Sequence, residues 1–342
     1  MKVTERKVFI LGVSYTHVLM ATTPEDGRYA PVTKQLDRYV SEFGLMQRRV
    51  RAEVVYLTLL SQHGLIRPLT SKELHILTNI HRQMKLKDAI VIKDIETGAN
   101  AEVLAKKGLK AGTKHDVMAM IDWFKFKLRQ NGMSDLEEKV HYMLTSEDVN
   151  NVAYRLQLLD ACREVIFPKL KEILLSLAAT SEKHIALPML GRTHGQPAVT
   201  TTFGKEYANF LSRLFREYQK LIACPLTGKM NGAVGNYNAH HFLEEDVNWV
   251  QFSEEYAGAL GLKPSLYTTQ INPPEDIIEF LQILQRINNI LIDFAQDNWR
   301  YISDDWIGQK RKESEVGSST MAQKVNPIDL KMPKVTLVKP ML

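Results

Sequence analysis

The run 317–327 brings together side chains that could bind an anionic substrate and take a proton from it. Small residues flank Ser318 and Ser319, and the loop then supplies a cation, Lys324, and an amide, Asn326, before a proline fixes its exit. The mixture predicts a loop that closes over a carboxylate. A surface turn rich in Ser and Lys has the same composition and stays open as the alternative.

The string Arg192-Thr193-His194-Gly195-Gln196 places an imidazole just ahead of a long helical pattern. Imidazole exchanges protons near neutral pH, so His194 could act as a general acid or base. The chain has ten histidines, however, and a lone histidine is more often structural. The residue types alone therefore leave both interpretations of His194 open.

The block Thr145-Ser146-Glu147-Asp148-Val149-Asn150-Asn151 opens the first long helical pattern. Thr or Ser followed by acidic residues is the ordinary signature of a helix N-terminus, which is the simpler explanation. The backbone N–H groups of a helix start also suit anions, so capping and anion binding are compatible at this block.

Two further polar segments are predicted to lie outside helices. Asp26-Gly27 is a common turn sequence, and Arg28 and Tyr29 follow it directly. The segment 229–240 contains too much Gly and Asn for a helix interior, which predicts a loop at a helix junction. Structural packing is the alternative to a functional role for this segment.

Long helical patterns must position these groups, because strand patterns are scarce. Apolar residues recur at helical spacing over 277–294, which predicts a helix of about six turns that starts after Asn272-Pro273-Pro274. Similar patterns cover about 150–179, where Pro168 is expected to kink the helix, and about 201–222. Apolar residues on several faces of such helices favour a bundle and oligomerisation.

An N-terminal domain is predicted ahead of the long helices. Shorter helices are expected at about 32–63 and 71–84, separated by Gly64 and Pro68. The domain is expected to end near residues 133–138, because Asn131-Gly132 breaks the helical pattern there.

Composition limits the class of protein. The 342 residues are 44% hydrophobic and 24% charged, which allows a large core and more than one domain. The net charge of +5 arises at the two ends, so no patch for nucleic acid is indicated. No apolar run approaches the ~18 residues that a membrane span needs. The two cysteines show neither metal-ligand nor disulfide spacing, so we expect a soluble protein of a reduced, cytoplasmic setting.

Taken together, the blocks resemble the signatures of the fumarase/aspartase superfamily and, in detail, those of the adenylosuccinate lyase family. The resemblance runs from about residue 23 to residue 329, with at least five motifs in the family's order, and it includes Thr113-Lys114-His115-Asp116. It implies an all-α fold with an N-terminal helical domain and a long central helical bundle. It also implies a homotetramer in which each site draws residues from three subunits.

The resemblance implies a role for each candidate residue. Ser318 would be the base that removes a proton beside a carboxylate, and His194 the acid that protonates the departing purine nitrogen. Asn150 and Asn151 would support the site, with His240 nearby. The implied substrate-binding residues are Arg28 and Tyr29, on the phosphate, and His115, Asp116, Thr145, Ser146, Thr193, Gln196, Lys229, Asn231, Gln270, Ser319, Lys324 and Asn326.

The implied activity is the β-elimination of fumarate from adenylosuccinate, giving AMP, and from succinyl-aminoimidazole-carboxamide ribotide in purine biosynthesis. No metal or organic cofactor, no nucleic acid and no membrane is implied. Argininosuccinate lyase, aspartase and fumarase are rivals within the superfamily. The rival from another class is a truncated helical bundle that binds or assembles without catalysis.

The chain departs from the family's pattern at Lys114, Ala322 and Gln323, and entirely after Asp329. Restoring one nucleotide after the Asp329 codon allows residues 330–342 to be reread with the family's expected sequence, which leads us to hypothesise a frameshift.

We therefore expect four parts in the chain. Residues 1–19 are an extension without a family match, and residues 20–135 form the N-terminal helical domain. Residues 136–329 form the central bundle, which is expected to be incomplete, and 330–342 are an aberrant tail. The C-terminal helical domain of the family is expected to be missing.

Overall fold

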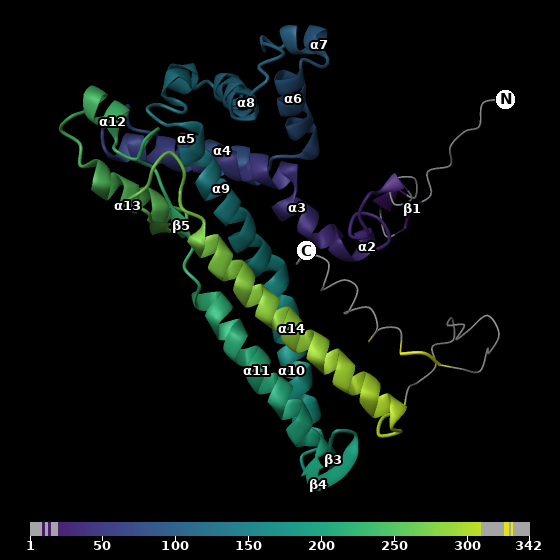
Figure 1. Ribbon diagram of the computed structural model, residues 1–342. Helices are drawn as coiled ribbons and strands as arrows, with labels where there is room; N and C mark the ends of the chain where they lie inside the picture. The colour runs from purple at the N-terminus through teal and green to yellow at the C-terminus, as the bar shows by residue number, and fades with distance from the viewer. Residues whose placement is uncertain (1–8, 11–12, 15–19, 309–324, 328–329, 331–342) are drawn as a thin grey trace, which may run out of the picture. The chain divides into compact units, whose positions relative to one another are not determined.

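Helices dominate the computed structural model of this protein, which confirms the expected all-α fold (Figure 1). Its contacts divide the chain into two compact units. The first unit spans Met1–Val165 and Pro225–Ile277, and the second spans Ile166–Cys224 and Ile278–Leu342. The structure describes residues 9–10, 13–14, 20–308, 325–327 and 330.

The first unit is organised around α4 (Glu42–Gln62). This helix packs against α5 (Ser71–Arg82), α8 (Asp116–Gln130) and α9 (Ser146–Ala161). Its apolar side chains are completely buried along much of its length, so α4 is the central element of the core. The remaining helices of the unit are α2 (Ala30–Thr33), η1 (Lys34–Leu36), α3 (Asp37–Val40), α6 (Leu86–Thr97), α7 (Ala101–Ala105), η2 (Ser134–Lys139), α12 (Asn238–Leu243) and α13 (Trp249–Ala259).

Strands in this unit are minimal. An antiparallel pair, β1 (Phe9–Ile10) and β2 (Val13–Ser14), lies near the N-terminus. A parallel pair, β5 (Thr227–Gly228) and β6 (Lys263–Pro264), joins the chain before and after α13. The second pair matters for the site, because β5 leads directly into the segment 229–240.

The prediction of one helix over about 32–63 is wrong. The chain forms α2, η1 and α3 and then breaks at Ser41, whose ψ of 173° is extended. The Gly44 N–H donates to the Ser41 hydroxyl over 3.2 Å, so Ser41 caps a new helix. The predicted helix at 71–84 is confirmed as α5, which ends two residues earlier, at Arg82.

The second unit contains three long helices. They are α10 (Phe167–Lys183), α11 (Phe203–Ala223) and most of α14 (Glu275–Ser303), which confirms the predicted helices at about 201–222 and 277–294. Figure 1 shows them side by side, and the Phe294 ring packs edge-on against the rings of Tyr207 and Phe210. An antiparallel hairpin of β3 (Pro188–Thr193) and β4 (Gln196–Thr202) connects α10 to α11.

The helix predicted over about 150–179 is interrupted. After α9 ends at Ala161, a π-helical turn, η3, covers Cys162–Ile166, and α10 follows. Pro168 lies in the first turn of α10, where a missing N–H is tolerated. The predicted distortion therefore occurs, but as a π-helical turn just before the proline.

The expected domain boundary near residue 135 stays a prediction. None of the helices within the described residues combines the length and the apolar character needed to cross a membrane.

Candidate functional site

A buried ion pair joins two of the sequence motifs in the first unit. Asp148 of α9 and Lys229, the residue after β5, have their Oδ1 and Nζ atoms 3.0 Å apart, and neither side chain is exposed. Lys229 Nζ also donates to the Gly232 carbonyl over 2.7 Å. The backbone N–H groups of Asn231 and Gly232 donate to Asp148 Oδ1 over 3.2 and 3.3 Å. Loss of either partner would leave an uncompensated buried charge.

Two asparagines hold the backbone around this ion pair. Asn151 accepts from the Lys229 N–H at 2.9 Å and donates to the Lys229 carbonyl at 3.0 Å. Asn231 donates to the Leu266 carbonyl at 3.2 Å and accepts from the Thr268 hydroxyl at 2.9 Å. The two amides thus fix the turn after β5 to α9 and to the segment that precedes α14. The predicted carboxylate-binding role of Lys229 and Asn231 stays a prediction.

Arg49 connects two further motifs and was not a candidate in the sequence analysis. Its side chain is 3% exposed; Nε donates to Asn150 Oδ1 over 2.8 Å, and Nη2 lies 2.7 Å from Asp116 Oδ2. Burial alone would raise the pKa of the Asp116 carboxyl, but the charge and hydrogen bond of Arg49 hold it below its ordinary value. Because Asp116 begins α8 and Asn150 lies in the second turn of α9, two helix starts flank one guanidinium.

The signal for Arg49 was present but weak. Arg48, Arg49 and Arg51 are a basic run, and such a run is usually a solvated helix face. The distinguishing feature is helical spacing, since Arg49, Glu53 and Tyr56 recur at i, i+4 and i+7 and therefore share one face of α4.

Glu53 on that face fixes the segment that leads into α9. Its Oε2 accepts from the backbone N–H of His141 at 3.0 Å, and its Oε1 lies 2.6 Å from His141 Nδ1. Tyr56 adds a hydrogen bond to the Tyr142 carbonyl at 2.8 Å. Burial would lower the pKa of His141, but its hydrogen bond and attraction to Glu53 raise the pKa above the ordinary value.

The motif residues at the two helix starts lie beside this network. Thr145 is the N-cap of α9 and its N–H donates to Asp148 Oδ2 over 2.9 Å, which confirms the predicted helix start. Ser146 is the first helical residue and is half-buried. His115 is the N-cap of α8, where its Nδ1 accepts from the Met118 N–H at 3.4 Å. Exposed N–H groups at such positions can hold the carboxylates of a substrate.

His194 occupies a different setting, at the tip of the β3–β4 hairpin in the second unit. Thr193 pairs with Gln196, so His194 and Gly195 form a two-residue turn with φ values of 53° and 74°. Positive φ at both positions is the type I′ geometry that matches the twist of a hairpin. Arg192 Nη1 donates to the Gly195 carbonyl at 3.1 Å. Thr193, His194 and Gln196 are all exposed, and the sequence analysis did not predict this hairpin.

The remaining candidates lie at Arg28 and Tyr29, at Gln270 and in the 317–327 run. The predicted turn before Arg28 is confirmed, since the Gly27 N–H donates to the Thr23 carbonyl at 3.0 Å. The Arg28 guanidinium carbon lies 6.0 Å from the centre of the Tyr29 ring. Gln270 is exposed and Asn326 is half-buried. Ser318, Ser319 and Lys324 lie outside the described residues.

The predicted loop at 229–240 is confirmed up to Asn238, where α12 begins. Gly235 has a φ of 78°, and a Cβ at this position would overlap the carbonyl of Thr268. His240 is completely buried with its ring 4.8 Å from that of Trp249, and burial lowers its pKa to about 4. His240 therefore supports the loop as a neutral, packed side chain.

In the part of the chain that the structure describes, no group of three or more His, Cys, Asp or Glu side chains is arranged to hold an ion.

Comparison with known proteins gives a consistent picture. A family model described as lyase matches residues 25–339. The adenylosuccinate lyase of Legionella pneumophila (strain Corby) is 41% identical over 313 residues, which are 91% of this chain and 66% of that protein. The adenylosuccinate lyase of Escherichia coli (strain K12) is 39% identical over 315 residues, with the same coverage of 91% and 66%. This chain thus spans slightly less than two thirds of the length of these relatives.

Solved structures share the fold at lower identity. The 3-carboxy-cis,cis-muconate lactonizing enzyme from Pseudomonas putida has a TM-score of 0.65 at 22% identity and covers 89% of this chain and 63% of its own. A fumarate lyase from Mesorhizobium sp. BNC1 has a TM-score of 0.63 at 18% identity, covering 89% and 64%. Because both identities are low, these two structures support the fold alone.

Proposed function

This chain belongs to the lyase family, and we propose that it carries the residues of an adenylosuccinate lyase, which releases fumarate from adenylosuccinate to give AMP. We extend the proposal to succinyl-aminoimidazole-carboxamide ribotide, so the activity would serve purine biosynthesis. The similarity to adenylosuccinate lyases at about 40% identity supports this choice over other fumarate-releasing lyases.

The observation that carries the proposal is the contact of Arg49 with both Asp116 and Asn150. It holds the helix starts that bear His115, Thr145 and Ser146 on either side of one buried cation. Because this contact fixes both helix starts, their N–H groups can stabilise negative charge without rearrangement. Elimination of fumarate needs such stabilisation of negative charge, because the substrate is a dicarboxylate and its charge grows on the carboxylate next to the departing proton.

In the proposed reaction, Ser318 takes the proton from the carbon beside a carboxylate. The electron pair of that C–H bond forms the double bond of fumarate as the carbon–nitrogen bond breaks. His194 gives its proton to the departing purine nitrogen, so the amine leaves neutral. Because a neutral hydroxyl cannot accept this proton, Ser318 would react as its alkoxide, formed by loss of a proton to water, and closure of the 317–327 loop would bring hydrogen-bond donors around it.

Binding follows from the same assignment. Lys324 and Asn326 would hold the carboxylate that gains charge, with Ser319 as a further donor. Arg28 and Tyr29 would hold the phosphate, and Thr193, Gln196 and Gln270 would contact the rest of the substrate. We propose a cytoplasmic homotetramer in which sites are completed by other subunits. The exposure of His194 supports this, since a general acid needs enclosure to work on a buried bond.

The test is fumarate release by the purified 342-residue chain, with adenylosuccinate and, separately, argininosuccinate as substrates. We expect release from adenylosuccinate alone, and loss of at least about a hundredfold in Ser318→Ala and in His194→Ala. His75→Ala changes an exposed histidine of α5 and serves as the matched control. A chain that binds AMP but releases no fumarate would instead be the non-catalytic bundle, and release from argininosuccinate would change the substrate class.

A further inference from the structure

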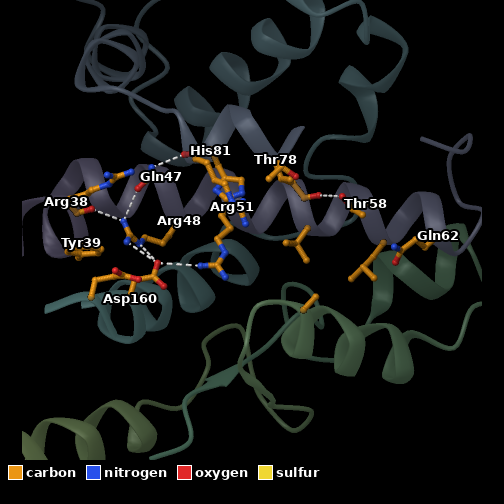
Figure 2. Close-up of a pocket in the computed structure, with 16 residues that line it drawn as sticks. Arg38, Tyr39, Gln47, Arg48, Arg51, Thr58, Gln62, Thr78, His81 and Asp160 are labelled. Atoms are coloured by element: carbon orange, nitrogen blue, oxygen red, sulfur yellow. Dashed lines mark hydrogen bonds and ion pairs between the residues drawn. The ribbon is translucent and has the colours of Figure 1, made fainter. Parts of the chain in front are cut away.

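A pocket of about 770 Å³ lies beside α4 within the first unit (Figure 2). Its wall carries four arginines, contributed by three successive helices, against only two carboxylates. The arginines are Arg38 of α3, Arg48 and Arg51 of α4, and Arg82 of α5. The two carboxylates are those of Asp160 and Glu164. The lining therefore has an excess of positive charge.

One of the four arginines is already fully engaged. Arg48 donates to Asp160 Oδ2 from Nε at 3.2 Å and from Nη2 at 3.0 Å, and its Nη1 donates to the Arg38 carbonyl at 2.8 Å. Its guanidinium also lies 5.2 Å from the centre of the Tyr39 ring. Arg48 is therefore part of the wall, and its charge is balanced by the Asp160 carboxylate.

The other arginines keep most of their charge available. Figure 2 shows Arg51 reaching the same Asp160 oxygen, but at 3.5 Å, and the Arg51 side chain remains 26% exposed. Arg38 and Arg82 are exposed, and within the described residues neither forms an ion pair. A single carboxylate thus serves two arginines, while two more have none.

The imidazole of His81 is affected by the positive charge of these arginines. His81 lies in the wall, where Gln47 donates to its carbonyl oxygen at 2.8 Å and links α4 to α5. Burial, and then the positive charges of Arg51, Arg82 and Arg48, lower the pKa of its imidazole to about 4. A neutral ring can donate a hydrogen bond to an anion without adding a further charge.

This pocket is separate from the candidate site. Residues 48, 51, 55, 58 and 62 recur at helical spacing and all line the pocket. Arg49, Glu53 and Tyr56 follow a second stripe, which at 100° per residue lies more than a quarter turn away. The pocket and the site thus use different faces of the same helix.

We propose that this pocket binds a small molecule that carries a phosphate or diphosphate group. Three helices contribute Arg38, Arg51 and Arg82 to the lining, and several guanidinium groups suit the several oxygens of a tetrahedral phosphate better than the planar edge of one carboxylate. The volume falls in the range of small-molecule sites, and the hydroxyl oxygens of Thr58 and Thr78 can accept hydrogen bonds from the rest of the ligand.

The test is isothermal titration calorimetry of the full chain with pyrophosphate at low ionic strength, where charged contacts are least screened. We expect saturable binding that weakens about tenfold in Arg82→Gln and again in Arg51→Gln, since each removes a charge-assisted hydrogen bond. Arg216→Gln, an exposed arginine of α11, is the matched control and should bind as the unaltered chain does. Circular dichroism confirms that each variant is folded.

Four outcomes would overturn the proposal. Absence of saturable binding would show that the charge excess holds no such ligand, and equal weakening in Arg216→Gln would show non-specific attraction. Citrate binding as tightly as pyrophosphate would remove the phosphate assignment. A site-resolved check uses Arg28→Gln, at the proposed substrate phosphate contact. If that variant, and not Arg82→Gln, removes pyrophosphate binding, the ligand occupies the lyase site. In the expected case, the His81 ring resonances shift on titration in the unaltered chain and in Arg28→Gln.

Discussion

The polar cluster around Asp148 and Lys229 and the hairpin that carries His194 are organised in opposite ways. In the cluster, both charged groups are buried and paired with each other, and the backbone N–H groups of Asn231 and Gly232 also donate to Asp148. In the hairpin, the histidine lies at the exposed tip of a two-residue turn. The contrast indicates that the first unit fixes the geometry of its polar cluster by itself, whereas the role that we propose for His194 needs surroundings beyond its own hairpin.

The largest effect should come from Lys229→Met, which leaves Asp148 charged and unpaired in the core. We expect the free energy of unfolding to fall by about 3–5 kcal/mol. Lys169→Met is the matched control, because Lys169 forms an ion pair of similar length, 3.1 Å to Glu172, on the surface of α10. Urea denaturation of both variants checks this, with a change within about 1 kcal/mol expected for the control. Equal losses would show that burial does not distinguish the two pairs.

A smaller loss is expected when Arg49 is replaced by glutamine. The variant removes the charge-assisted bonds to Asp116 and Asn150, which should lower stability by about 2 kcal/mol. The pKa of Asp116, held low by Arg49, should rise, and NMR titration of its carboxyl would measure this. Arg213→Gln breaks a surface ion pair with Asp293 in the second unit and should leave Asp116 unchanged. An unchanged Asp116 pKa in Arg49→Gln would contradict the assignment.

The Glu53–His141 pair should make the stability of the first unit depend on pH. Because the folded-state pKa of His141 is raised above 6.5, its stabilisation is fully present below pH 6.5 and is lost as the pH rises through the folded-state value. The gap in unfolding free energy between the unaltered chain and Glu53→Gln should therefore be about 2 kcal/mol at pH 6 and narrow toward pH 8. Glu255→Gln, which disrupts the more exposed pair with His63, should show a smaller gap. A gap that widens with pH would reverse the assignment.

The smallest effect is expected in the hairpin. Gly195→Ala forces a side chain into a backbone with φ of 74° and should lower stability by about 1 kcal/mol. Gly258→Ala is the opposite control, since Gly258 lies in α13 with open space around it and should gain about 0.5–1 kcal/mol. Thermal unfolding of both variants would check the sign, and a stabilising Gly195→Ala would argue against the type I′ turn.

The sequence was informative where a local pattern decides the structure. Thr145 starts a helix because an acidic residue three positions later can reach back to its N–H, and the apolar stripe over 277–294 gives α14. Both signals lie within a few turns of chain.

The sequence was silent where distant residues decide the outcome. Lys229 meets Asp148 across 81 positions of chain, and no spacing rule connects them. Arg49 and Arg48 differ only in the direction in which they leave α4, so one joins the candidate site and the other a separate pocket. The hairpin at 188–202 was missed because Gly191 and Pro197 interrupt its strand pattern.

Gly235 and its neighbour Val234 should differ sharply in what they tolerate. The backbone of Gly235 has positive φ and passes against the Thr268 carbonyl, so no other amino acid fits there. Val234 is 55% exposed and has solvent beside it. In a pooled library that randomises both codons and is selected for folded chains, we expect only glycine at position 235 and nearly all amino acids at position 234.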